Sequence, residues 1–288
     1  MCAVSVLYHP SSGEIENCLQ LASQVGHLVV VDNTPQPISL EIPKNLQNHV
    51  TLIQERKNLG MATALNQGAN IALMGGYSWL LTMDQDSVLE PNAVAKLIEV
   101  AKYHSHPPVG LIAPLIIDSH TILSHQEIQT SDSKVFDDDF IVTSGSLINL
   151  KAYREIGGFL DDFFIDYVDH EYTLRLREQG WRTLLTQCAR MHHQQGNLEP
   201  VRFLGKTFYT SNYPPDRWYY VTRNRLKCYH LHLKKNLSWI GQDFIAALRE
   251  FGKMVLLEKD RTGKIFAIIH GIFDFMIGKG GPRRREVV

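Results

Sequence analysis

The chain has 288 residues and the composition of an ordinary globular protein, which is enough for one large α/β domain with an appendage or for two small domains. Its four cysteines show neither paired nor metal-ligand spacing, and no positively charged, apolar signal sequence opens the chain. These features exclude a disulfide scaffold and predict a reducing, cytoplasmic setting. The net charge of -1 conceals an asymmetry, because residues 1–215 carry 14 Lys and Arg against 23 Asp and Glu, whereas residues 216–288 carry 15 against 7.

Apolar, β-branched runs alternate with helical segments in the first third of the chain. Strands are predicted at residues 3–7, 27–31, 50–53 and 79–83, and helices at residues 14–23 and 61–74. This alternation predicts an α/β fold with a mostly parallel sheet that helices cover on both faces. Ligands bind beyond the carboxyl ends of such strands, so Asp32, Asp84 and Asp86 are expected at one rim of the sheet.

The middle of the chain continues the same pattern. A helix is predicted at residues 91–103, followed by a strand at residues 110–117 and a polar surface loop at residues 118–140. A strand interrupted by small residues then covers 140–148, a helix covers 150–156, and a further strand covers 181–185, with loop and helix beyond.

Asp84 and Asp86 stand one residue apart at the end of the apolar run that begins at Trp79. Two carboxylates delivered by one strand favour a site for Mg²⁺ or Mn²⁺, whose usual additional ligand is a substrate diphosphate. The alternative is a plain turn in which one aspartate caps the next helix.

A second acidic cluster, with Asp166, Asp169 and Glu171, leads directly into an amphipathic segment. Carboxylates at a helix start often serve only as caps or as partners of the helix dipole. Beside a metal-diphosphate site, however, such a carboxylate could take a proton from an attacking hydroxyl.

The order of these motifs resembles a family 2 glycosyltransferase of the GT-A fold, and more closely the bacterial rhamnosyltransferases within that family. The resemblance spans roughly residues 3–230. It rests on these segments: Val-Val-Val-Asp-Asn (29–33), Asn-Leu-Gly (58–60) with Ala-Leu-Asn-Gln-Gly (64–68), Asp-Gln-Asp (84–86), Ser-Gly-Ser (144–146), Gly-Gly-Phe (157–159), Asp-His-Glu-Tyr-Thr-Leu-Arg (169–175), His-Gln-Gln-Gly (193–196) and Tyr-Tyr-Val-Thr-Arg-Asn (219–224).

The resemblance implies roles for individual residues on the donor side. Asp32 should receive the edge of the nucleobase, Asn58 and the Gly60 turn should flank the nucleotide, and Asp84 should lie near the ribose. Asp86 should ligate the cation, and His193 is similar to a late histidine of the family that approaches the metal or the diphosphate.

Two further roles concern the leaving group and the acceptor. Arg223 is a candidate clamp for the diphosphate, because a guanidinium can bind phosphate oxygens bidentately; its alternative is an ion pair that fastens the C-terminal helix. Asp169 is the candidate general base, with Asp166 or Glu171 sharing acceptor binding. Many members carry Glu-Asp where this chain has Val168-Asp169, but the aspartate is retained.

The implied activity is an inverting, metal-dependent transfer of a sugar from a nucleotide-sugar donor. The expected donor is dTDP-L-rhamnose and the expected acceptor is a saccharide, lipid-linked, in bacterial surface polysaccharide (O-antigen) synthesis. The alternatives are a transferase of the same fold that uses another nucleotide-sugar, and a non-catalytic module that binds nucleotide or carbohydrate. The absence of Gly-x-Gly-x-x-Gly after the first strand argues against a dehydrogenase.

Residues 231–288 are predicted to form a basic, amphipathic helical extension to a transferase domain at residues 1–230. Ile265, Ile269, Ile272 and Met276 are among the apolar residues on one helical face, and the apolar span is too short to cross a bilayer. An interfacial helix on anionic lipid fits this pattern, which places the protein on the inner face of the cell membrane. The alternatives are that this face packs on the protein or makes a dimer. Nucleic-acid binding lacks a recognised module.

Overall fold

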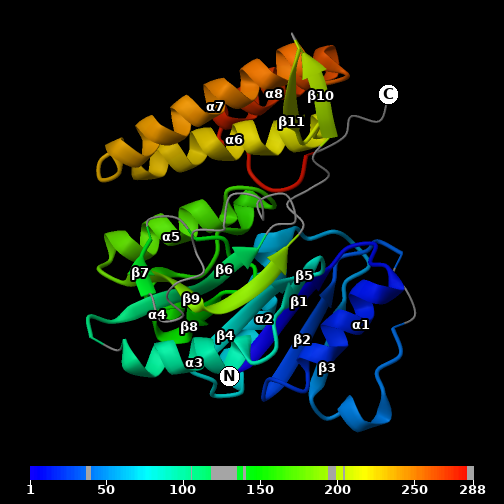
Figure 1. Ribbon diagram of the computed structural model, residues 1–288, viewed down its shortest axis with the longest axis vertical. Coiled ribbons are helices and arrows are strands. Elements are labelled where there is room, and N and C mark those ends of the chain that lie inside the picture. Colours follow the sequence, from blue (N-terminus) through cyan, green and yellow to red (C-terminus); the bar gives the residue numbers. More distant parts are fainter. Residues whose placement is uncertain are drawn as a thin grey trace. The chain divides into compact units, whose positions relative to one another are not determined.

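The computed structural model describes residues 1–36, 40–104, 106–117, 135–138, 141–193, 199–203 and 205–283. Contacts divide the chain into two compact units, coloured by sequence in Figure 1. The N-terminal unit comprises Met1–Phe164 and Val168–Gln194, and the C-terminal unit comprises Ile165–Tyr167 and Gln195–Val288. The predicted boundary at residue 230 therefore falls inside α6 (Pro215–His232), a helix of the C-terminal unit.

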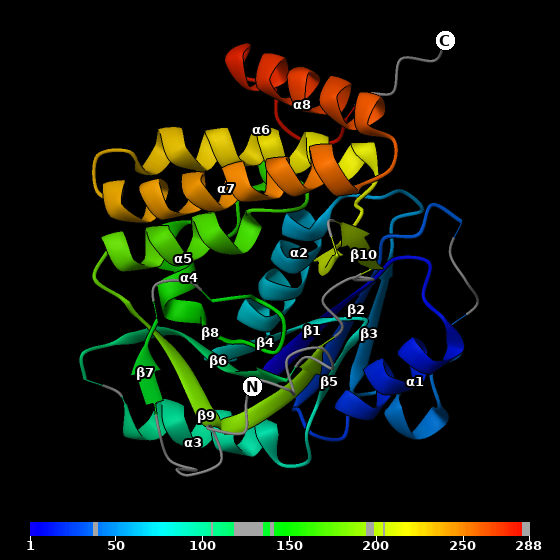
Figure 2. The ribbon, with the colours of Figure 1, turned by 45° about the horizontal axis from the view of Figure 1, so that its top comes forward.

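A central sheet organises the N-terminal unit, and nine of its strands lie in the described residues (Figures 1 and 2). The strand order is β3 (Val50–Gln54), β2 (His27–Asp32), β1 (Cys2–Leu7), β4 (Trp79–Asp84), β8 (Leu147–Asn149), β6 (Val109–Ile117), β9 (Arg182–His193) and β5 (Ser87–Leu89), with β7 (Val135–Asp137) paired to β9. The pairs among β1 to β4 and the pair of β6 with β9 are parallel, whereas β5, β7 and β8 pair antiparallel. The predicted α/β fold with a mostly parallel sheet is confirmed.

Helices cover both faces of this sheet because successive residues of its buried strands point to opposite faces. The helices of the unit are α1 (Ser12–Leu21), α2 (Met61–Met74), α3 (Ala93–Tyr103), α4 (Leu150–Ile156) and α5 (Val168–Glu178), with short 3₁₀ turns at Lys44–Leu46 and Asp161–Phe163. On one face, α1 and α3 share a core with Ala3. On the other, the next residue, Val4, meets Gly68 of α2, where a Cβ would collide with the valine side chain.

Two sequence expectations differ from the structure in the middle of the chain. The strand predicted at residues 140–148 is confined to β8, because the small residues before it form a turn in which Gly145 has a φ of +71°. Part of the loop predicted at residues 118–140 is strand β7, whose Asp137 forms a bidentate ion pair with Arg182 of β9. Residues 118–134, 139 and 140 lie outside the described residues.

The C-terminal unit contains a β-hairpin, β10 (Glu199–Phe203) and β11 (Lys206–Thr210), and the helices α6, α7 (Leu237–Leu257) and α8 (Arg261–Met276). Trp218 and Tyr219 of α6, Met254 of α7 and Ala267 of α8 form its apolar core. Close approach of α8 to α6 requires Gly271, since a Cβ there would lie 2.7 Å from the carbonyl oxygen of Tyr219. None of the described helices is long and apolar enough to span a membrane.

Helix α8 buries two charged residues and exposes most of its large apolar ones. Its buried positions are Lys264, Ala267, Gly271 and Asp274, which recur at helical spacing. The Lys264 ammonium group pairs with Glu258 at 2.8 Å, and the Tyr219 hydroxyl donates to Asp274 at 2.7 Å. The side chains left outside are Ile265, Phe266, Ile269, Ile272, Phe273 and Met276.

Candidate active site

Strand register brings Asp32 and Asp84 to one rim of the sheet. Central strand β1 pairs Leu7 with Asp32 on one side and Val6 with Asp84 on the other, so both aspartates stand at the carboxyl end of this parallel block. The sequence predicted this placement from the two strand ends.

The turn that precedes β8 fixes the position of Asp84. The backbone N–H of Asp84 donates to the Ser144 hydroxyl at 3.0 Å, and that hydroxyl also lies 2.8 Å from the hydroxyl of Ser87. Gly145 donates its N–H to the carbonyl of Thr82 at 2.7 Å, and a Cβ at this glycine would collide with the sulfur of Met191. The predicted Ser-Gly-Ser motif therefore acts as a brace at the end of β4.

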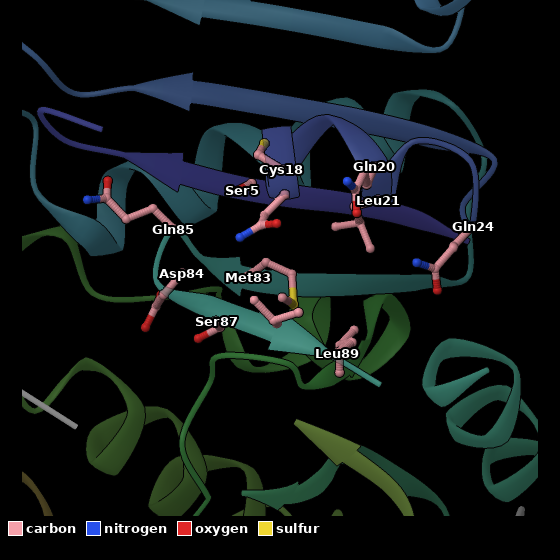
Figure 3. A pocket seen from close by; sticks show the side chains of 12 residues that line it. Ser5, Cys18, Gln20, Leu21, Gln24, Met83, Asp84, Gln85, Ser87 and Leu89 are labelled. Carbon is pink, nitrogen blue, oxygen red and sulfur yellow. The ribbon is translucent and has the colours of Figure 1, made fainter. Parts of the chain in front are cut away.

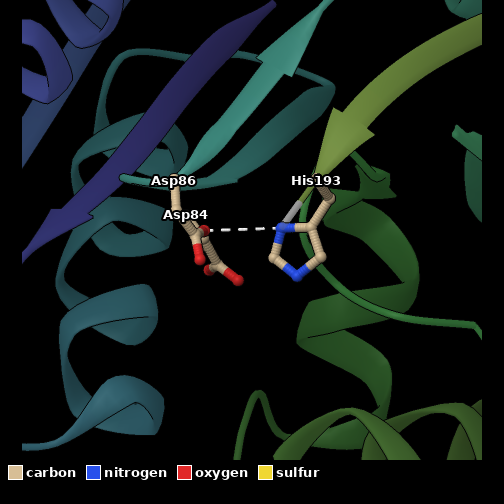
Figure 4. Close-up of side chains that lie close together, drawn as sticks. All are labelled: Asp84, Asp86 and His193. Carbon is tan, nitrogen blue, oxygen red and sulfur yellow. Dashed lines mark ion pairs between the residues drawn. The ribbon is translucent and has the colours of Figure 1, made fainter. Parts of the chain in front are cut away.

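Asp84, Asp86 and His193 form a candidate metal site (Figure 4). Each offers one ligand atom, and these atoms lie within 4.8 Å of one another. Antiparallel pairing of β5 with β9 places Ser87 opposite His193, so the histidine comes to the aspartate turn from a distant part of the chain. Its Nδ1 lies 2.8 Å from the Ser87 hydroxyl and 3.4 Å from Asp86 Oδ1.

The electrostatics of this cluster suit a bound cation. Burial raises the pKa of Asp84 to about 6, and the charges of Asp86 and Asp169 contribute to the rise, against the opposing effect of His193. Two carboxylates held this close repel each other unless a positive charge lies between them. Carboxylate oxygens are ligands that both Mn²⁺ and Mg²⁺ accept, and the added imidazole nitrogen suits Mn²⁺ better than Mg²⁺.

Asp169 occupies the first turn of α5, and its charge contributes to the raised pKa of Asp84. Burial opposes ionisation of Asp169, but hydrogen bonds and charge from His170 outweigh it, and the pKa lies below the usual value. The His170 N–H donates to Asp169 Oδ1 at 3.1 Å. The carboxylate is therefore ionised at neutral pH and able to accept a proton.

The predicted nucleotide-binding residues lie at the end of β2 and in the turn that precedes α2. Asp32 is buried and accepts from the Thr34 N–H at 2.9 Å and from the Gln54 amide at 3.0 Å. Asn58 accepts from the Gly60 N–H at 2.9 Å, which forms a turn before α2. Gly60 has a φ of +85°, and a Cβ there would lie 2.5 Å from Phe164, so glycine is required.

A small cavity of about 50 Å³ adjoins Asp84 between β1, α1 and the β4–β5 turn (Figure 3). Gln85 lies at its edge and donates to Glu14 at 3.1 Å, while its amide oxygen accepts from the Tyr8 N–H at 2.7 Å. This side chain fastens the middle of the Asp-Gln-Asp turn to the start of α1. Sequence reasoning gave Gln85 no role, although its place between the two aspartates was a signal.

Glu171, a predicted acceptor residue, is held in structural contacts. It is 2% exposed, and both its carboxylate oxygens accept hydrogen bonds from Arg175 at 2.7 Å. Arg175 also donates to the carbonyls of Ile156 and Gly158, so the pair fastens the glycine turn to α5. This arrangement accounts for Glu171 without an acceptor.

Arg223 is 1% exposed and lies in the C-terminal unit. Its guanidinium donates to the Gly281 carbonyl at 2.6 Å and to Asn224 at 3.0 Å, and it stacks over the Tyr219 and Tyr220 rings. These contacts fasten the segment after α8, through hydrogen bonds and ring contacts and not through the ion pair that the sequence left open as the alternative. Asp166, in the same unit, pairs with Arg217 at 3.3 Å.

Comparison with known proteins gives the same picture. Residues 8–130 match the family described as glycosyl transferase family 2. The chain is 27% identical over 247 residues to the dTDP-rhamnosyl transferase RfbF of Shigella flexneri, covering 81% of this chain and 80% of that protein. The resemblance to family 2 glycosyltransferases, and to rhamnosyltransferases within the family, is confirmed.

Solved structures agree at the level of the fold. Residues 1–349 of S. aureus TarS align with 96% of this chain and 81% of that chain, at a TM-score of 0.62 and 12% identity. GalNAc-T7, solved with UDP, GalNAc and Mn²⁺, aligns with 74% of this chain at a TM-score of 0.51 and 13% identity. This chain spans 45% of the length of the GalNAc-T7 chain.

Proposed function

We propose that this family 2 glycosyltransferase moves L-rhamnose from dTDP-L-rhamnose to a saccharide acceptor, lipid-linked, during synthesis of a bacterial surface polysaccharide. The observation that carries the proposal is the grouping of Asp84, Asp86 and His193, whose ligand atoms lie within 4.8 Å of one another. The sequence similarity to a dTDP-rhamnosyl transferase supports the choice of donor.

Asp84, Asp86 and His193 are the residues that would hold a divalent cation. When bound, Mg²⁺ or Mn²⁺ supplies positive charge to the diphosphate leaving group. Asp86 is the more exposed of the two aspartates, with 44% of its side chain accessible, and it faces His193. Asp84 is braced by Ser144 and keeps the cluster in register with β4.

Asp169 acts as the general base. It accepts the proton of the acceptor hydroxyl while that oxygen forms a bond to the anomeric carbon of the donor, and the bond from this carbon to the diphosphate oxygen breaks. One displacement inverts the configuration at carbon. General-base assistance of this kind contributes roughly 10²–10⁴-fold to the rate.

Asp32, Asn58 and Gly60 serve the nucleoside. The oxygens of Asp32 are oriented by Thr34 and Gln54, and carboxylate oxygens have further lone pairs for donors on a base edge. The Asn58 turn presents backbone at the start of α2, where Gly60 allows close approach.

The apolar face of α8 associates with the inner surface of the cell membrane. Phe266 and Met276 are 70% and 74% exposed, whereas the buried positions of α8 are Lys264, Ala267, Gly271 and Asp274. An exposed apolar stripe with basic neighbours is typical of a helix that lies in the membrane interface.

Product formation and donor binding, measured with a panel of nucleotide-sugars and Mn²⁺, test the proposal. Asp169→Asn should lower turnover at least a hundredfold and leave dTDP-rhamnose affinity within a few-fold. Asp86→Asn should remove the Mn²⁺ dependence of donor binding. The control is Asp162→Asn, which makes the same isosteric change at an exposed position.

Three outcomes would contradict parts of this proposal. Normal turnover in Asp169→Asn would show that Asp169 is not the general base. Donor affinity that is independent of Mn²⁺ in the wild-type chain would contradict the metal site. Faster transfer from another nucleotide-sugar would replace dTDP-rhamnose as the donor, and binding of nucleotide-sugars without turnover would favour a non-catalytic module.

A further inference from the structure

A basic pocket lies between α6 and α8 in the C-terminal unit. Its volume is about 320 Å³, within the size of small-ligand sites. Four of its lining residues carry basic side chains: Arg223, Lys227, His230 and Lys279. Three others are apolar: Leu231, Phe275 and Met276.

The turn after α8 builds one wall of this pocket. Gly278, at a φ of +72°, reverses the chain, so its N–H donates to the Phe275 carbonyl at 3.0 Å and the N–H of Lys279 donates to the Asp274 carbonyl at 2.8 Å. The Lys279 ammonium group then lies 3.2 Å from the Asp274 carboxylate, with a third of its side chain accessible. This geometry holds the Lys279 ammonium group, paired with Asp274, in the lining of the pocket.

The opposite wall comes from α6. The Arg223 guanidinium is held by hydrogen bonds to Tyr219, Asn224 and Gly281, so its positive charge keeps a fixed position in the pocket wall. Lys227 follows one helical turn later, and the exposed His230 packs its ring edge to face with Phe275 at 6.3 Å. Among the described residues that line the pocket four are basic and none is acidic, and Asp274 pairs with only one of the four, Lys279, so the charge favours an anion.

The apolar walls decide between a free anion and an amphiphile. Met276 is largely exposed, and it continues the outward apolar face of α8 through Phe273 and Ile269. Leu231 on α6 is 47% exposed at the same pocket. A free phosphate ion would have no use for these side chains, whereas a lipid has both an anionic head group and hydrocarbon.

We propose that this pocket binds the phosphate head group of an anionic membrane phospholipid, with the acyl chains against Leu231, Phe275 and the exposed face of α8. The proposal rests on the membrane association proposed above and deepens it, because it assigns recognition of the head group to particular residues. Lys227 and Lys279 contact the phosphate directly, and Arg223 supplies fixed positive charge behind them.

Vesicle partitioning of the full chain tests the site. Vesicles of phosphatidylglycerol mixed with phosphatidylcholine should pellet the protein, and pure phosphatidylcholine should pellet far less. Lys227→Gln with Lys279→Gln is expected to weaken partitioning about 30-fold, given the usual contribution of each basic residue near an anionic surface. The matched control is Lys234→Gln with Lys235→Gln, which removes the same charge from exposed positions outside the pocket. Its fold-loss of partitioning should be at most one fifth of that of the pocket variant.

Further arms separate the explanations. Because Lys279 contacts Asp274, Lys227→Gln alone against Lys234→Gln alone repeats the comparison without that ion pair, and thermal unfolding checks that each variant is folded. Equal partitioning of the pocket and control variants overturns the proposal. A thermal shift with inorganic phosphate as large as that with short-chain phosphatidylglycerol also overturns it, in favour of a free-anion site.

The same measurements distinguish an error in the pocket proposal from an error in the proposed membrane association or sugar transfer. If the wild-type chain fails to bind either kind of vesicle, both the pocket and the membrane association are wrong, and sedimentation of the free protein then shows whether the apolar face of α8 makes a dimer instead. Sugar transfer to a soluble acceptor is measured in parallel, so loss of vesicle binding with intact transfer leaves the catalytic proposal standing.

Discussion

Replacement of Asp84 by asparagine should stabilise the metal-free protein. The pKa of Asp84 is raised to about 6 in the folded chain, mainly by burial and by the charge of Asp86. In the unfolded chain it returns to about 3.9. Ionisation therefore opposes folding: the cost is absent below the unfolded pKa, grows as pH rises, and is complete above the folded pKa.

The size of the effect follows from the two pKa values. The difference of about two pKa units corresponds to about 3 kcal/mol of unfolding free energy at about pH 8, and to about 1.5 kcal/mol at about pH 5. An asparagine amide cannot ionise, so Asp84→Asn should recover these amounts. For a chain of this length the shift at the higher pH is an increase in Tm of roughly 6 °C.

Thermal or urea unfolding in EDTA at the two pH values measures this prediction. Asp162→Asn removes one negative charge from an exposed site and serves as the control. Added Mn²⁺ should narrow or reverse the difference, because a ligand that binds the folded wild type stabilises it by mass action. If Asp84→Asn and the wild type unfold alike in EDTA at both pH values, the charge of Asp84 is not destabilising and the electrostatic account of the site is refuted.

Three further predictions concern residues of and around the candidate site. Gly60→Ala should destabilise the fold by about 3 kcal/mol, because a Cβ at φ +85° would lie 2.5 Å from Phe164. The control is Gly13→Ala in α1, which has open space around it and should be neutral or slightly stabilising. Equal Tm values for the two variants would contradict the packing argument. Glu171→Gln should cost about 3 kcal/mol, because it leaves the half-buried Arg175 guanidinium without its buried carboxylate, while Glu155→Gln in an exposed pair should cost little. A selective increase in acceptor KM at unchanged stability would instead assign Glu171 to the acceptor site. At saturating Mn²⁺, Asp169 should impose no acid limb on kcat near neutral pH, because hydrogen bonds and charge from His170 lower its pKa below the usual range. An acid limb near neutral pH that moves in Asp169→Glu would contradict this prediction.

The elements that carry the aspartates could be predicted because their signals are local. The apolar run before Asp84 and the Ala-rich segment 61–74 each fix their own structure, and α2 begins and ends where the sequence indicates. The common rim of Asp32 and Asp84 then follows from parallel pairing with β1.

The remaining parts depend on pairings between distant segments. Strand β5 has three residues and no periodicity to read, yet its pairing with β9 is what places His193 beside Asp86. The small residues before β8 resemble an interrupted strand, but hydrogen bonds to Thr82 and Asp84 hold them as a turn. Whether Glu171 and Arg223 face a ligand or a structural partner is decided by tertiary contacts that a single sequence does not encode locally.

The buried charged residues of α8 bear on how the protein would leave a membrane surface. Lys264 and Asp274 fasten the helix to the rest of its unit through ion pairs and hydrogen bonds, none of which uses the outward apolar face. In the membrane association proposed above, the helix is already formed before it meets lipid, and docking would require no coupled folding with its entropic cost. Such attachment would be rapid and reversible, and release would leave the C-terminal unit folded.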